Sequence, residues 1–328
     1  MNPTNGTPQS ITSSENVTSV WFWTIAGVIN LLIFSANGLL AYVIIKAQRL
    51  HHSANWFILS LAVSNFLSGL FVIPSCMICN LWLSCNDDVR FILLDLVVYV
   101  SIANVSVMSL DRLAAVELPM RYQSMVAPRF KLWILFAWLV PVVVSIVPLC
   151  WMFAEAGSTI VKINKIFRAV QLVVFELLPC AIMVIVHGRI FIIRRKHSRQ
   201  IQHQRTQLNL ETQFSSESVG RSNFRTEKSV GVIAFLVFFF VLCWIFSLVL
   251  TSCKYFEVCK VSREALIASS LLVFVNPAVN PLICLFLKTD IRKEVRRLLR
   301  FWMVVSKMDE AGYKCYYLRT WPPARTPR

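Results

Sequence analysis

Charged residues are scarce in this chain. Asp, Glu, Lys and Arg make up 15% of its 328 residues, whereas a soluble domain carries about 25%. Glycine is scarce too, at nine residues, which excludes a collagen-like or linker-dominated protein. Hydrophobic residues, in contrast, make up 56% of the chain. No soluble fold of this length needs so much apolar surface, so the composition indicates a protein that lies in a bilayer.

Acidic residues are fewer than basic ones, 17 against 33, which gives a formal net charge of +16. In a soluble protein this balance would suggest nucleic-acid binding. Here the basic residues gather in loops and a tail between apolar runs. We therefore expect a basic cytoplasmic surface that meets membrane lipids, and no nucleic-acid partner.

The sequence also lacks the signatures of metal and cofactor sites. Its ten cysteines include one C-x2-C pair, Cys76 and Cys79, but this pair lies inside an apolar run and no second such pair accompanies it, so it does not predict a zinc site. Cys85, Cys253 and Cys259 lie near expected outer loops and are candidates for disulfide bonds. No lysine lies between Arg263 and Lys288 in the last apolar run, which excludes retinal held as a Schiff base. We expect no metal and no cofactor.

Seven apolar segments are long enough to cross a bilayer, which takes about 20 residues each. We therefore predict an all-α membrane protein, a seven-transmembrane helix bundle over residues 20–287. The expected spans are 20–46, 54–80, 89–113, 131–153, 167–193, 229–252 and 264–287.

The two ends of the chain differ in character. Residues 1–19 are polar, lack the apolar core of a signal peptide, and hold glycosylation sequons at Asn5 and Asn16. Residues 288–303 have apolar side chains at helical spacing among basic ones, which predicts a short amphipathic helix on the inner leaflet. Residues 304–328 form a cytoplasmic tail. The polar loop 194–227 shows no apolar periodicity, so we expect it to be mobile.

Basic residues indicate the orientation. Of the 33 Lys and Arg residues, 26 lie in or beside the loops after spans one, three and five and in the C-terminal tail, and seven lie on the other side. The positive-inside rule then puts the C-terminus in the cytoplasm and the N-terminus outside. We expect a multi-pass protein of the plasma membrane.

Short motifs narrow the class of membrane protein. Span three ends in Asp111-Arg112-Leu113, span six contains Cys243-Trp244, and span seven contains Asn276-Pro277 and Asn280-Pro281. Single residues add to these motifs in the other spans: Asn37, Asn65, Trp138 and Pro179. These motifs occur in the order that is typical of the rhodopsin-like (class A) G-protein-coupled receptors, which the chain resembles over residues 20–303. Within that family its sequence looks most like amine and other small-ligand receptors.

The resemblance implies a receptor, not an enzyme, that binds an extracellular small-molecule ligand and activates a heterotrimeric G protein. It implies that Asp111 pairs with Arg112 at rest and that Arg112 meets the G protein on activation. Trp244 would lie beneath the ligand, and Asn280 and Pro281 would belong to the switch in span seven.

Several positions depart from the family pattern. The tyrosines of the motifs in spans three, seven and five are replaced by Leu113, Cys284 and His187. Span six has Phe246 in place of the usual proline. These changes do not alter the expected fold, but they affect motifs that the family uses to switch between its resting and active states.

Asp95 and Glu176 are the acids expected inside the outer half of the bundle. An intramembrane carboxylate costs roughly 2.5–3.5 kcal/mol on insertion scales, so it usually faces the interior and has a function. Amine receptors carry their aspartate one residue earlier, where this chain has Leu94, and one residue is about 100° around a helix. Both acids are candidates for the ligand pocket. The alternatives for Asp95 are a protonated acid bonded to a neighbouring helix and an ion pair with Arg90.

A polar set is expected in the bundle core: Asn37, Asn65, Ser101, Asn276 and Asn280. In the family such residues surround a sodium ion or a water cluster. Because Asn65 replaces the usual aspartate, no carboxylate offsets the desolvation of an ion. Water or direct hydrogen bonds are therefore favoured over sodium.

Other functions remain open at this point. An orphan or constitutively active receptor fits the altered motifs. A transporter would need broken helices or internal repeats, which are not evident in the sequence.

Overall fold

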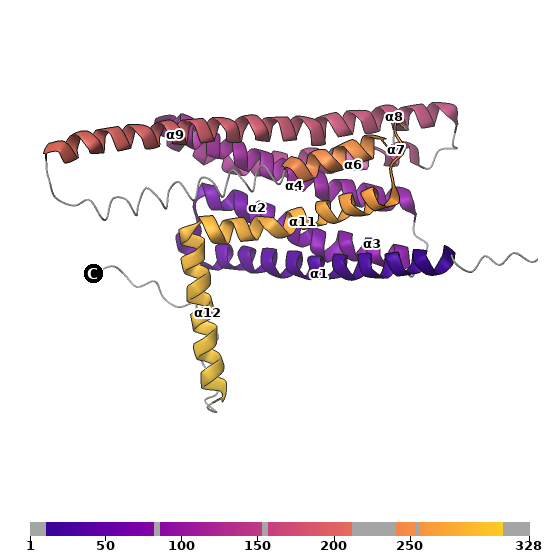
Figure 1. The fold of residues 1–328 in the computed structure, drawn as a ribbon, viewed down its shortest axis with the longest axis horizontal. Coiled ribbons are helices and arrows are strands. Elements are labelled where there is room, and N and C mark those ends of the chain that lie inside the picture. Colours follow the sequence, from indigo (N-terminus) through magenta and orange to yellow (C-terminus); the bar gives the residue numbers. More distant parts are fainter. Residues whose placement is uncertain are drawn as a thin grey trace, which may run out of the picture.

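The computed structural model describes residues 11–81, 86–152, 157–211, 241–253, 256 and 258–310. Within these ranges the regular elements are all helical, and the long helices run side by side (Figure 1). Six helices are long and apolar enough to cross a membrane, and Val241–Cys253 is a shorter apolar helix where span six was expected. Residues 229–240 of that span lie outside the described ranges. The predicted fold class, a seven-helix membrane bundle, is confirmed.

The long elements are as follows. They are α1 (Ile11–Lys46), α2 (Ser53–Leu67), α3 (Ile73–Leu81), α4 (Asp87–Glu117), α6 (Phe130–Ile146), α8 (Ser158–Gln171), α9 (Leu178–Glu211), α11 (Arg263–Leu287) and α12 (Thr289–Glu310). The short elements are α5 (Pro119–Arg121) and α7 (Leu149–Met152).

Helix α4 has a central place in the bundle. It packs against α2, α6 and α9, while α1 packs against α2 and α11. Its residues Tyr99 and Ile102 join a buried apolar cluster with Phe175, Met183 and Trp244. The polar side chains of α4 are therefore held between several neighbouring helices.

Two spans contain a widened π-helical turn just before a proline. Residues Ser68–Val72 connect α2 to α3 ahead of Pro74, and Leu172–Leu177 connect α8 to α9 ahead of Pro179. Proline has no N–H and its ring clashes with the carbonyl four residues earlier. A wider turn relieves that clash and keeps each span continuous.

Several helix ends differ from the expected ones. Helix α1 begins at Ile11, inside the segment expected to be a polar tail, and α8 begins at Ser158, nine residues before the expected span. The prediction that the loop 194–227 lacks structure was wrong for its first part, because α9 continues to Glu211. No glycine or proline interrupts the chain between Pro179 and Glu211 except Gly188, and the Arg, Lys and Gln residues there favour a helix.

Helix α12 turns away from the bundle where α11 ends (Figure 1). Lys288 has extended backbone angles between α11 and α12, which separates the two helices. Ile291, Val295 and Leu298 of α12 are buried in a cluster with residues of α1 and α2. The helix runs to Glu310, seven residues beyond its expected end.

Other sequence predictions have partial answers here. Cys253 and Cys259, two of the three candidate cysteines, form a disulfide bond with each other. Cys85 and the sequon at Asn5 lie outside the described residues. Asn16 lies in α1, and its side chain is not described.

Candidate functional site

An ion pair between α4 and α8 marks the outer half of the bundle. Arg168 on α8 pairs with Asp95 on α4, and Nη1 of Arg168 also donates to Oε1 of Gln171 at 3.2 Å. The side chains of Asp95 and Arg168 are 14% and 29% exposed. Glu176, in the wide turn after α8, lies within electrostatic range of both. We call Asp95, Arg168 and Glu176 the outer charge cluster.

The partner of Asp95 was not predicted from the sequence. Arg168, near the start of the fifth expected span, lies in helix α8 and neutralises Asp95. The side chain of Arg90, the alternative partner, is not among those described. The signal for Arg168 was present: a lone cation beside an apolar span is a natural partner for an intramembrane acid.

Aromatic rings connect the outer charge cluster to the bundle core. Arg168 donates to the hydroxyl oxygen of Tyr99, and the Tyr99 ring stacks on Phe175 with centroids 4.7 Å apart. Both rings pack in the same buried cluster as Trp244. A movement of side chains in the outer charge cluster can therefore be passed to Trp244 through the packed rings of Tyr99 and Phe175.

A cavity lies beside Trp244. It is lined by Leu94 and Trp244 together with four members of the expected polar set. These four are Asn65, Ser101, Asn276 and Asn280. Asp95 and Glu176 are absent from the described lining, so Leu94 faces the cavity while Asp95 turns toward Arg168. This matches the rotation of about 100° per helical residue.

Direct hydrogen bonds join part of the polar set. Ser101 donates to Oδ1 of Asn65 at 3.0 Å, and Nδ2 of Asn65 contacts Oδ1 of Asn37 at 3.5 Å. Asn37 donates in turn to the carbonyl of Pro277 in α11 at 3.1 Å. Nδ2 of Asn276 is buried with no hydrogen-bond partner among the described residues. The polar set thus connects α1, the span of α2, α4 and α11.

Sequence reasoning missed a second polar chain. Trp138 donates to the Ser60 hydroxyl at 2.9 Å, and Ser60 donates to Oδ1 of Asn104 at 2.6 Å. A polar residue facing the middle of a bundle usually bonds across helices, which was the available signal.

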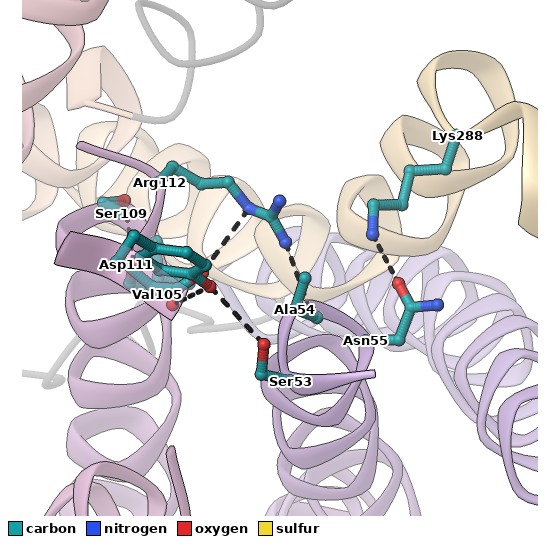
Figure 2. Close-up of polar contacts among 9 residues, drawn as sticks. Ser53, Ala54, Asn55, Val105, Ser109, Asp111, Arg112 and Lys288 are labelled. Carbon is teal, nitrogen blue, oxygen red and sulfur yellow. Dashed lines mark hydrogen bonds and ion pairs between the residues drawn. The ribbon is translucent and has the colours of Figure 1, made fainter. Parts of the chain in front are cut away.

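Arg112 lies at the end of the bundle where α2 begins, close to Ser53 and Ala54 (Figure 2). Its Nη2 donates to the carbonyl of Ala54 at the start of α2, at 3.2 Å, and its Nε lies 3.9 Å from Oδ2 of Asp111. The Tyr122 hydroxyl donates to Oδ1 of Asp111 at 2.8 Å and lies 3.5 Å from the Ser53 hydroxyl. Burial raises the pKa of Tyr122, so it stays a neutral donor. The buried Asp111 is thus held by Tyr122 as well as by Arg112.

A second cation stands near Arg112. Lys288, between α11 and α12, donates to Oδ1 of Asn55, as Figure 2 shows. Burial lowers the pKa of Lys288, and the neighbouring Arg112 guanidinium lowers it further. Arg112 of α4 and Lys288 after α11 therefore both lie near the carboxylate of Asp111.

The whole chain was compared with known families and proteins. The model of the family described as 7 transmembrane receptor (rhodopsin family) matches residues 36–283. The chain belongs to the rhodopsin family of seven-transmembrane receptors. It is therefore a G-protein-coupled receptor of the plasma membrane that crosses the bilayer several times, binds a ligand and activates a heterotrimeric G protein, and it is not an enzyme.

Individual relatives of the receptor are more distant. It is 28% identical to the histamine H2 receptor of Cavia porcellus over 73% of this chain and 68% of the relative. It is 23% identical to the octopamine receptor beta-2R of Chilo suppressalis over 90% and 84%. It is 26% identical to a D(1)-like dopamine receptor of Takifugu rubripes over 83% and 69%.

Proposed function

We propose that this receptor binds a small organic amine through its outer charge cluster. The observation that carries the proposal is the charge balance there: two acids, Asp95 and Glu176, and one base, Arg168. Arg168 pairs with Asp95, which leaves the cluster with a formal charge of −1 when Glu176 is ionised. A ligand cation would bring the cluster to neutrality.

The physical reason is the cost of a buried charge. A carboxylate held away from water without a partner is strongly unfavourable, and a positioned cation offsets much of that cost. The relatives' names support the same ligand class, since histamine, octopamine and dopamine are all amines.

The effect of ligand binding would pass to the G-protein side through side chains that pack against one another. A ligand at the cluster would shift Tyr99 and Phe175, which contact the Trp244 cluster. Trp244 borders the cavity that contains Asn276, Asn280 and their polar neighbours, and Pro281 follows in α11. Arg112 would then leave Ala54 and Asp111 and contact the G protein.

The test measures G-protein activation by histamine, octopamine, dopamine and tyramine in membranes that contain the receptor. Glu176→Gln keeps the shape of the side chain and removes its charge. We expect it to raise the half-maximal amine concentration by about tenfold or more, since hydrogen bonds to charged groups contribute about 1.5–3 kcal/mol.

The matched control is Glu264→Gln, an exposed acid in the first turn of α11. It should leave the amine response unchanged. Equal responses from Glu176→Gln and the unmodified receptor would contradict the proposal, and so would the absence of a response to every amine.

A further inference from the structure

Gln171 offers an unused donor beside the outer charge cluster. Its side chain is 1% exposed, and its Oε1 accepts from Arg168 at 3.2 Å. Its Nε2 has no hydrogen-bond partner among the described residues. A buried amide N–H without a partner is unfavourable, so this position is suited to an acceptor supplied from elsewhere.

Arg168 adds a second donor at the same place. Its guanidinium lies beside Asp95, Gln171 and the Tyr99 hydroxyl. A guanidinium matches the two oxygens of a carboxylate through paired N–H bonds. Donors from Arg168 and Gln171 therefore lie next to acceptors from Asp95 and Glu176.

We propose that the ligand is an amine that also carries a carboxylate, such as an α-amino acid, with its carboxylate on Arg168 and Nε2 of Gln171 and its ammonium on Asp95 and Glu176. This inference rests on the proposed function, because it names the kind of amine that the same cluster takes.

The guanidinium of Arg168 favours such a ligand over a plain amine. A plain amine brings a cation next to the guanidinium of Arg168, and the two cations repel each other. A zwitterion replaces the Arg168–Asp95 pair with two new contacts, guanidinium to the ligand carboxylate and the ligand ammonium to both Asp95 and Glu176. The net charge of the cluster stays at −1, but each charged group then faces one of opposite sign, which offsets its desolvation.

The test compares matched probes that differ by one carboxylate: histidine against histamine, and tyrosine against tyramine. In the unmodified receptor we expect the carboxylated probe to activate the G protein at a concentration at least about tenfold lower. Arg168→Gln should remove or reverse that preference. Lys165→Gln, one turn earlier on the exposed side of α8, is the control and should keep it.

Since Arg168→Gln also removes the partner of Asp95, a second variant guards against a folding defect. Gln171→Met keeps the Arg168–Asp95 pair and removes only the amide. It should weaken the response to histidine and tyrosine more than the response to histamine and tyramine, with surface expression measured in parallel.

Two results would overturn the inference. The first is an equal or stronger response to the plain amines that neither Arg168→Gln nor Gln171→Met alters. If Glu176→Gln still weakens that response, the amine proposal stands and the zwitterion fails. The second is no response to any of the four probes, which would defeat both proposals.

Discussion

Arg112 bonds to a backbone carbonyl of α2. Its Nη2 donates to Ala54, and Asp111 lies 3.9 Å from its Nε. A carbonyl on a neighbouring helix holds the guanidinium in place at rest while leaving it close to the cytoplasmic surface. Its exposed fraction of 36% fits a side chain that a partner protein can reach.

We predict that Arg112→Ala abolishes G-protein activation while leaving surface expression within about twofold, because a half-exposed cation contributes little to packing. The measurement is nucleotide exchange on the G protein, alongside cell-surface labelling. Arg121→Ala, an exposed arginine in α5, is the control and should signal normally. Full signalling by Arg112→Ala would remove this residue from the coupling mechanism.

Two features of the site relate to the sequence in different ways. The rotation of Asp95 away from the Leu94 position follows from helix geometry, whereas Asn65 and Ser101 were expected in one polar set from the family resemblance. Tyr122 was missed because it reaches Asp111 from a non-periodic turn after α4. The amide of Gln171 was missed because burial of a polar residue depends on the packed neighbours.

Helices were predictable over the thickness of the bilayer and less so outside it. The hydrocarbon core of about 30 Å demands an apolar run, so the span from the start of α2 to the end of α3 and helix α11 begin and end close to the expected residues, and α6 begins close to its expected start. The ends of α1 and α9 run on in polar sequence, where a helix has no apolar signature. The bundle was therefore predicted in its membrane part, and its extensions were not.

Helix α12 is fixed to the bundle by one buried face. Ile291 is fully buried among α1 and α2 residues, while Leu299 is 52% exposed. We predict that Ile291→Ala destabilises the receptor by about 2–5 kcal/mol, since it leaves a cavity. At about 2–4 °C per kcal/mol, the midpoint of thermal unfolding should fall by several degrees.

The measurement is thermal unfolding of the detergent-solubilised receptor, followed with a thiol-reactive dye. Leu299→Ala is the control and should change the midpoint by about 2 °C or less, because exposed substitutions are usually within 0.5 kcal/mol. Equal shifts for the two variants would show that α12 is not anchored through Ile291.

The whole molecule has a strong charge asymmetry, with 26 basic residues on the side expected to be cytoplasmic and seven on the other. We predict that a tag on Met1 is accessible on intact cells and a tag on Arg328 only after permeabilisation. Removal of N-linked glycans should also shift the mass of the chain through Asn5 and Asn16. Both tags on one side of the membrane would contradict an odd number of crossings.

The length of α9 has a mechanical consequence. Its 34 residues make a rod about 50 Å long, longer than the hydrocarbon layer is thick. Such a rod acts as a lever pivoting near Leu178, close to the outer charge cluster. A rotation of about 5° at that pivot displaces the tip near Glu211 by about 4 Å. A movement too small to disturb packing near the ligand would therefore be magnified where the G protein binds.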